Sequence, residues 1–125
     1  MAYVRFTLLR PRQGEEREAA RVLDTLDSHI ARAPGLLLSL VMTGETDGLG
    51  RVSVWRSKEE ANREAMSDRT MALRSRLHQL AATTEEHLFE LESGNLRKAL
   101  ESLLALDRPP EEPMADVYQV ALPVQ

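Results

Sequence analysis

The middle of the chain, residues 36–55, reads LLLSLVMTGETDGLGRVSVW. Its first eight residues are almost all apolar, as expected of a strand that is mostly buried. A glycine-rich turn follows at residues 44–50, and residues 51–55 then alternate, with two valines opposed to Ser53 and Trp55. Two such strands joined by a turn predict a β-hairpin at the centre of the fold.

The segment before this hairpin predicts a strand and a helix. Residues 3–10 alternate with a period of two, which is typical of a strand with two unlike faces. Between Glu15 and Ala33, apolar residues recur every three or four positions, as in a helix that buries one side. Glutamates suit the positive start of this helix, and Pro34-Gly35 ends it.

The segment after the hairpin predicts a second helix and a fourth strand. Ser57 and Glu60 form a capping box, so a helix begins there, and it breaks or tightens at Ser67-Asp68. Residues 86–92 then predict the last strand. The order strand, helix, strand, strand, helix, strand is that of a split β-α-β, ferredoxin-like α+β sandwich, with helices on one face of an antiparallel sheet.

The pattern divides the chain into a ferredoxin-like domain at residues 1–93 and an extension at residues 94–125. In the extension, residues 96–104 predict a short amphipathic helix, a proline-rich connector follows, and residues 114–122 have strand character. The helix is too short to be stable alone in water, so it must bury its apolar stripe. We expect the extension to dock on a partner subunit, with docking on its own sheet as the alternative.

Composition restricts the possible partners and compartments. The 125 residues suffice for one core, and 20 acidic residues are interspersed with 16 basic ones, which argues against nucleic-acid binding. The absence of cysteine excludes disulfides and thiolate sites. No apolar run approaches a membrane span, and the first residues do not read as a leader, so we expect a cytoplasmic protein.

A sheet with helices on one side leaves its other side uncovered. A second copy of the same sheet would bury the apolar side chains of that face. The sequence therefore predicts a homodimer.

The chain resembles the antibiotic biosynthesis monooxygenase (ABM) family of dimeric α+β barrels. The resemblance spans roughly residues 3–92 and rests on two motifs. One is APGL at residues 33–36, which leads into a strand, and the other is VWRSKEEA at residues 54–61, which joins a strand to a helix. These are scaffold motifs, which specify a fold better than an activity.

Some ABM members oxidise polyaromatic phenols to quinones without metal or flavin, and the chain resembles them in part. Trp55 matches their tryptophan, and Arg74 matches their arginine if one residue is deleted near Asp68. Arg51 stands in place of their asparagine and Ala61 in place of their tyrosine. The resemblance implies a cofactor-independent, monooxygenase-like protein that acts on a small aromatic metabolite.

Four residues are the candidate site. The candidate catalytic residues are Arg74, which would favour a phenolate, and His78, which could accept a proton near neutral pH. Trp55 and Arg51 are candidates for substrate binding. The structural alternatives are that Trp55 packs the core and that Arg74 and His78 are surface residues. An aromatic content of 4% and the missing asparagine favour a second class of function, a non-catalytic dimer that binds a ligand or serves a structural role.

We expect neither a metal nor a cofactor. The haem-degrading members of the family need an asparagine, a second tryptophan and a histidine at positions that correspond here to Thr7, Ala65 and Arg74 or Leu73. Haem degradation is therefore rejected, unless His78 has become the ligand one turn later. The three histidines lie on separate predicted elements without zinc-site spacing.

Overall fold

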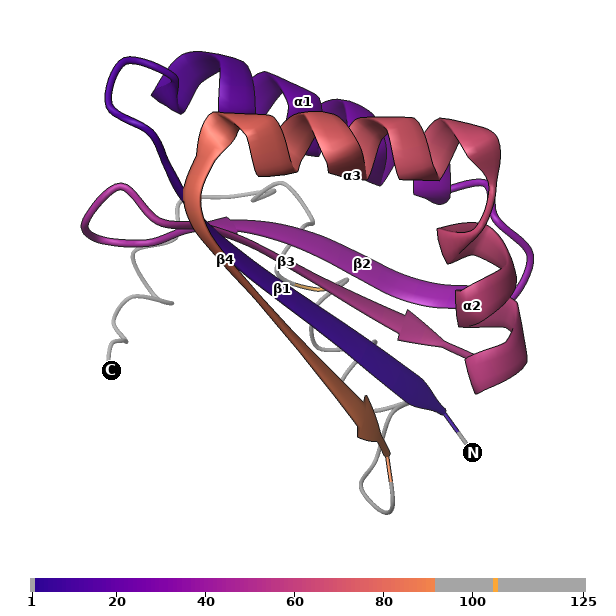
Figure 1. Cartoon of the computed structure of the whole chain (residues 1–125). Helices are drawn as coiled ribbons and strands as arrows, with labels where there is room; N and C mark the ends of the chain where they lie inside the picture. Colours follow the sequence, from indigo (N-terminus) through magenta and orange to yellow (C-terminus); the bar gives the residue numbers. More distant parts are fainter. Residues whose placement is uncertain (1, 92–104, 106–125) are drawn as a thin grey trace, which may run out of the picture. The chain divides into compact units, whose positions relative to one another are not determined.

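The computed structural model describes residues 2–91 and residue 105, and residues 2–91 contain four strands and three helices (Figure 1). Their order agrees with the split β-α-β prediction. The elements are β1 (Tyr3–Pro11), α1 (Glu16–Ile30), β2 (Leu36–Thr43), β3 (Leu49–Trp55), α2 (Lys58–Ala65), α3 (Asp68–Leu80) and β4 (Ala81–Glu90).

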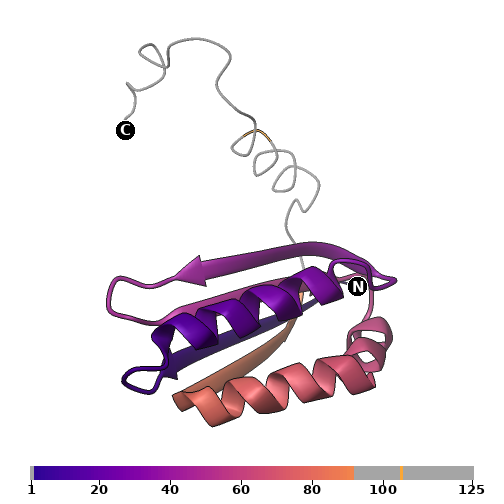
Figure 2. The ribbon, with the colours of Figure 1, turned by 90° about the horizontal axis from the view of Figure 1, so that it is seen from above.

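The strands form one antiparallel sheet in the order β2-β3-β1-β4. Helices α1 and α3 lie over one face of this sheet, as the two views in Figures 1 and 2 show. This arrangement is the ferredoxin-like α+β sandwich, and the predicted fold class is confirmed.

Two serine caps divide the segment between β3 and β4 into α2 and α3. The Ser57 Oγ accepts a hydrogen bond from the Glu60 amide at 3.2 Å, and the Ser67 Oγ accepts one from the Thr70 amide at 3.4 Å. The predicted break at Ser67 is therefore confirmed. The Glu60 carboxylate departs from the capping-box pattern, because its Oε1 accepts from the Ser57 hydroxyl at 3.1 Å.

Strand β4 begins at Ala81, whereas the sequence predicted a start at residue 86. The prediction was wrong because Leu80 and Ala81 continue the apolar stripe of the preceding helix. In the structure the backbone becomes extended at Ala81. The Arg12 amide, just beyond β1, donates to the Leu80 carbonyl at 2.8 Å and satisfies the helix end, so no loop is needed.

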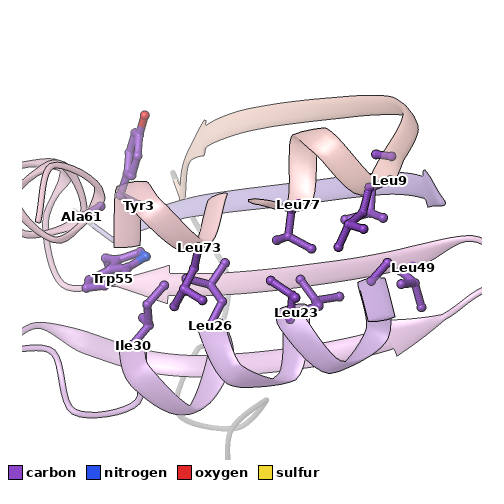
Figure 3. Close-up of a cluster of buried hydrophobic side chains, with 14 residues drawn as sticks. Tyr3, Leu9, Leu23, Leu26, Ile30, Leu49, Trp55, Ala61, Leu73 and Leu77 are labelled. Atoms are coloured by element: carbon purple, nitrogen blue, oxygen red, sulfur yellow. The ribbon is translucent and has the colours of Figure 1, made fainter. Parts of the chain in front are cut away.

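The core lies between the sheet and the two long helices, and Trp55 is its largest side chain (Figure 3). Trp55 is only 2% exposed and belongs to the same cluster as Tyr3, Ile30 and Ala61. Its Nε1 donates to the Ser53 Oγ at 2.9 Å, which satisfies the one polar atom of the buried ring. Trp55 therefore joins β3 to α1 and α2 by packing.

Two expectations are not tested by this fold. The extension of residues 94–125, with its predicted helix and strand, lies outside the described residues except for residue 105. The cytoplasmic location likewise remains a prediction. In the part of the chain that the structure describes, no helix is both long and apolar enough to cross a membrane.

Gly35 joins α1 to β2 in a conformation that disfavours other residues. Its φ is 88°, and a Cβ there would overlap the carboxylate of Glu60. The Gly35 carbonyl also accepts from the Arg56 amide at 2.7 Å. The glycine therefore allows the turn after α1 to pack closely on the start of α2.

We predict that Gly35→Ala lowers the free energy of unfolding by about 1–2 kcal/mol, because an L-residue is strained at positive φ and the Glu60 side chain must move. Gly14→Ala, at a φ of 89° in open space, should lose less. Gly48→Ala is the control, because Gly48 is not at positive φ and an added Cβ there would contact nothing. Urea unfolding measures all three, and equal stability of Gly35→Ala and Gly48→Ala would contradict the prediction.

Candidate functional site

A cavity of about 140 Å³ lies between the sheet and helices α1 and α3. The four residues predicted from the sequence, Arg51, Trp55, Arg74 and His78, all line it. One part of its wall is apolar and comes from the sheet and both helices; these side chains are Leu9, Leu23, Leu26, Ile30, Trp55 and Leu77. The structure therefore places the predicted residues around one space, although it does not test their roles.

The polar part of the cavity wall follows from strand register. Thr7 of β1 lies directly opposite Arg51 of β3 and Glu86 of β4, and Arg5 lies opposite Ser53. Side chains on directly paired residues point to the same face of a sheet, which is here the face under the helices. The polar half of the β1 alternation is thus the floor of the cavity.

Arg51 is fixed by a buried network that joins three elements. Its Nε donates to the Asp27 Oδ1 at 3.1 Å, and its Nη2 donates to the Ser39 Oγ at 3.2 Å. The Ser39 hydroxyl also donates to the Asp27 carboxylate. Because Asp27 is on α1 and Ser39 on β2, the network fastens the helix to the sheet beside the cavity.

The Arg51 side chain is only 4% exposed, whereas that of Asp27 is 24% exposed. Burial lowers the pKa of the Arg51 guanidinium from its ordinary value, and Asp27 acts against this by favouring the charged form. Arg5 and Arg74 lower the same pKa further because they are also positive. Three guanidinium groups are thus close enough to interact, so nearby carboxylates are needed to balance their charge.

Arg74 lies at the edge of the cavity in a shared ion pair. Its Nη2 contacts the Glu86 Oε2 at 2.8 Å, and the Arg5 Nη1 contacts the same oxygen at 3.1 Å. The Arg74 side chain is 32% exposed and that of Arg5 is 12% exposed. One carboxylate oxygen therefore holds two guanidinium groups from different elements.

His78 is exposed on α3, and its Nδ1 lies 3.5 Å from the Thr84 Oγ1, a long contact. A histidine at the cavity edge can exchange protons with solvent. Its predicted role as a proton acceptor therefore remains a prediction that its position permits.

A second carboxylate, Glu64 of α2, lies in the cavity wall and was not predicted. Its Oε2 accepts hydrogen bonds from the Thr70 Oγ1 at 2.6 Å and the Ser67 Oγ at 3.0 Å. The His29 Nε2 lies 3.3 Å from the same oxygen, which links α2 to α1. These contacts orient the Glu64 side chain, which is 15% exposed.

The acidic and hydroxyl partners of the predicted residues were not predicted from the sequence. Ser39 lies within an apolar run, and a polar residue within a buried run was the available signal, whereas Asp27 stands between Leu26 and Ser28 and gave no such signal. Glu86 was assigned to a strand without a partner. Residues 2–91 contain no group of three or more histidine, aspartate and glutamate residues placed to hold a metal ion.

Comparisons by sequence find no matching family model and no matching curated protein. Comparisons by structure find the same fold at low identity. SnoaB from Streptomyces nogalater, a cofactor-independent oxygenase, matches as a variant with a TM-score of 0.68 and 16% identity, over 76% of this chain and 97% of SnoaB. Rv0793 from Mycobacterium tuberculosis matches with a TM-score of 0.68 and 14% identity, over 75% of this chain and 98% of Rv0793.

A third solved structure, a candidate antibiotic biosynthesis monooxygenase from Chloroflexus aurantiacus, has a TM-score of 0.64 and 19% identity, over 76% of this chain and 97% of that one. The protein is therefore a ferredoxin-like α+β protein, and its cavity lies between the helices and the sheet. More particularly, residues 2–91 have the fold of the ABM-type monooxygenases.

We predict that Asp27→Ala lowers the free energy of unfolding by about 2–4 kcal/mol, because it leaves the buried charge of Arg51 without its partner. The control is Glu18→Ala on the same helix, which breaks the exposed pair with Arg21 and should change stability little. Urea unfolding compares the two variants. A loss for Asp27→Ala no larger than that for Glu18→Ala would show that the network contributes little.

Proposed function

We propose that the protein is a cofactor-independent, monooxygenase-like enzyme that acts on a small aromatic metabolite. The observation that carries the proposal is a cavity whose wall is partly apolar and partly lined by arginines that are paired with carboxylates. Leucine side chains of both helices suit an aromatic ring, and the guanidinium groups suit an acidic oxygen on that ring. The likeness in fold to SnoaB supports the same interpretation.

The proposed reaction needs no external reductant. A phenol with a free ring position combines with O2 to give a quinone and water, so one oxygen atom enters the ring and the other leaves as water. The substrate supplies all four electrons. The protein would favour the reactive phenolate through Arg74 and Arg51, accept the phenolic proton at His78, and exclude water with its apolar wall.

The second candidate is a non-catalytic dimer that binds a ligand or has a structural role. The observation in its favour is that several polar groups of the cavity already have protein partners. The Trp55 Nε1 donates to Ser53, and Arg51 and Arg74 are ion-paired with Asp27 and Glu86. Turnover without added metal or flavin distinguishes the two candidates.

We predict substrate-dependent O2 uptake by the purified protein with single-ring phenols that have a free para position. Added chelator should not change the rate. Arg74→Ala should lower kcat/KM by about tenfold or more, because a hydrogen bond to a charged group is lost, while thermal stability stays nearly unchanged.

The control is Arg76→Ala, an arginine of the same helix whose hydrogen bond goes to Gln79. It should keep full activity. No O2 uptake with any phenol that binds would favour the non-catalytic candidate. If Arg74→Ala instead lowers the thermal stability sharply while ligand binding persists, then Arg74 has a structural role.

The homodimer is part of the proposal. The sheet face opposite the helices carries apolar side chains from paired strands, such as Val4 opposite Val54 and Phe6 opposite Val52. Two side chains of this face are clearly exposed, Leu8 at 37% and Phe89 at 54%. Burying such a face against a second copy would remove apolar surface from water.

We predict a solution mass near twice 14.1 kDa by light scattering at micromolar concentration. Leu8→Glu should shift the equilibrium toward monomer, because it places a charge in the proposed interface. Leu88→Glu is the control, since Leu88 is 48% exposed and lies opposite Arg5, on the helix side of the sheet. A strict monomer, or equal dissociation of both variants, would contradict this interface.

A further inference from the structure

Two arginines at the open side of the cavity converge on a single oxygen atom. The Arg5 Nη1 and the Arg74 Nη2 both donate to the Glu86 Oε2, at 3.1 Å and 2.8 Å. The three residues come from β1, α3 and β4, and all of them line the cavity. Folding therefore builds a two-guanidinium site for one anionic oxygen, and the protein's own carboxylate occupies it.

We propose that Arg5 and Arg74 bind the anionic group of a single-ring aromatic ligand, and that Glu86 is an internal competitor which this group displaces. The inference that this ligand is aromatic rests on the proposed function. The anion site itself rests on the convergence of the two guanidinium groups on Glu86. Glu86 thus sets the affinity of the cavity for acidic ligands and its preference for them over neutral ones.

The size of the cavity limits the ring system. A space of about 150 Å³ lined by apolar side chains accommodates a benzene molecule, and the cavity here measures about 140 Å³. Pockets for drug-sized ligands typically measure roughly 300–1,000 Å³. Leu77 lies about one helical turn from Arg74 on α3 and contributes apolar wall, so one ring can lie against it while its acidic group faces the arginines.

The exchange leaves no buried charge without a partner. The Glu86 side chain is 32% exposed, so after displacement it can be solvated by water at low cost. Arg5, which is 12% exposed, remains in contact with the ligand anion and with the Asn62 Oδ1 at 3.4 Å. A neutral ligand cannot replace Glu86, because it would leave two partly buried guanidinium groups without an anion.

Calorimetric titration of the full chain with benzoate tests the proposal, and benzamide is the neutral probe. Glu86→Gln should tighten benzoate binding by about tenfold or more, because it removes the competing anion. Glu90→Gln removes the same charge from the same strand, without a described contact to Arg5 or Arg74, and should change affinity less than twofold. Arg5→Gln should weaken benzoate binding about tenfold.

Benzamide affinity should stay the same in all variants. Benzoate binding that is unchanged or weaker in Glu86→Gln, in a protein that still melts cooperatively, would overturn the proposal. So would equal tightening by Glu90→Gln, which would indicate a general charge effect. Tighter benzoate binding without any O2 uptake would uphold the anion site and reject the enzyme, whereas phenol oxidation insensitive to Glu86→Gln would do the reverse.

Discussion

The guanidinium group of Arg51 is buried between α1 and the sheet, and the positions of the other cavity residues depend on how its charge is compensated. Asp27 reaches it from α1 and Ser39 from β2. A buried cation without such partners would cost several kcal/mol, so the helix and the two strands are held in one arrangement. This arrangement places a cavity, rather than a continuous leucine core, beside Arg51.

The other arginines of the cavity are also paired with a carboxylate, nearer to its edge. Arg5 and Arg74 are positive and close enough to lower the pKa of Arg51, so an anion must lie near them. Glu86 supplies that anion. The pairs become more exposed toward the edge, from 4% for Arg51 to 32% for Arg74, and an exchange of partners is therefore less costly at the edge than inside.

The fold alone does not decide between an enzyme and a binding protein. The three solved structures described above share this fold but are only 14–19% identical to this chain over about three quarters of its length, and one scaffold can carry several functions. Function has to be argued from the cavity. The proposal of an acidic aromatic ligand rests on apolar wall and paired guanidinium groups lying within one space.

The sequence by itself determined the element order and the sides of the strands. The signals for this order are local: the periods of two and 3.6 residues, the Ser57 and Ser67 caps and the Pro34-Gly35 stop. Each depends only on residues close in sequence, so it can be recognised without the tertiary structure. The start of β4 was missed because Ala81 fits a helical stripe as well as a strand. Its extended conformation depends on pairing with β1, which is distant in sequence.

The candidate site was predictable only in part for the same reason. Arg51, Trp55 and Arg74 were singled out by the family resemblance and His78 by its place in the same helix as Arg74, and the structure brings all four to one cavity. Their partners could not be found, because an ion pair such as Arg74 with Glu86 depends on the strand register and on how α3 lies over the sheet. Local sequence thus determined which side chains face the helices, and only tertiary packing decided which of their charges meet.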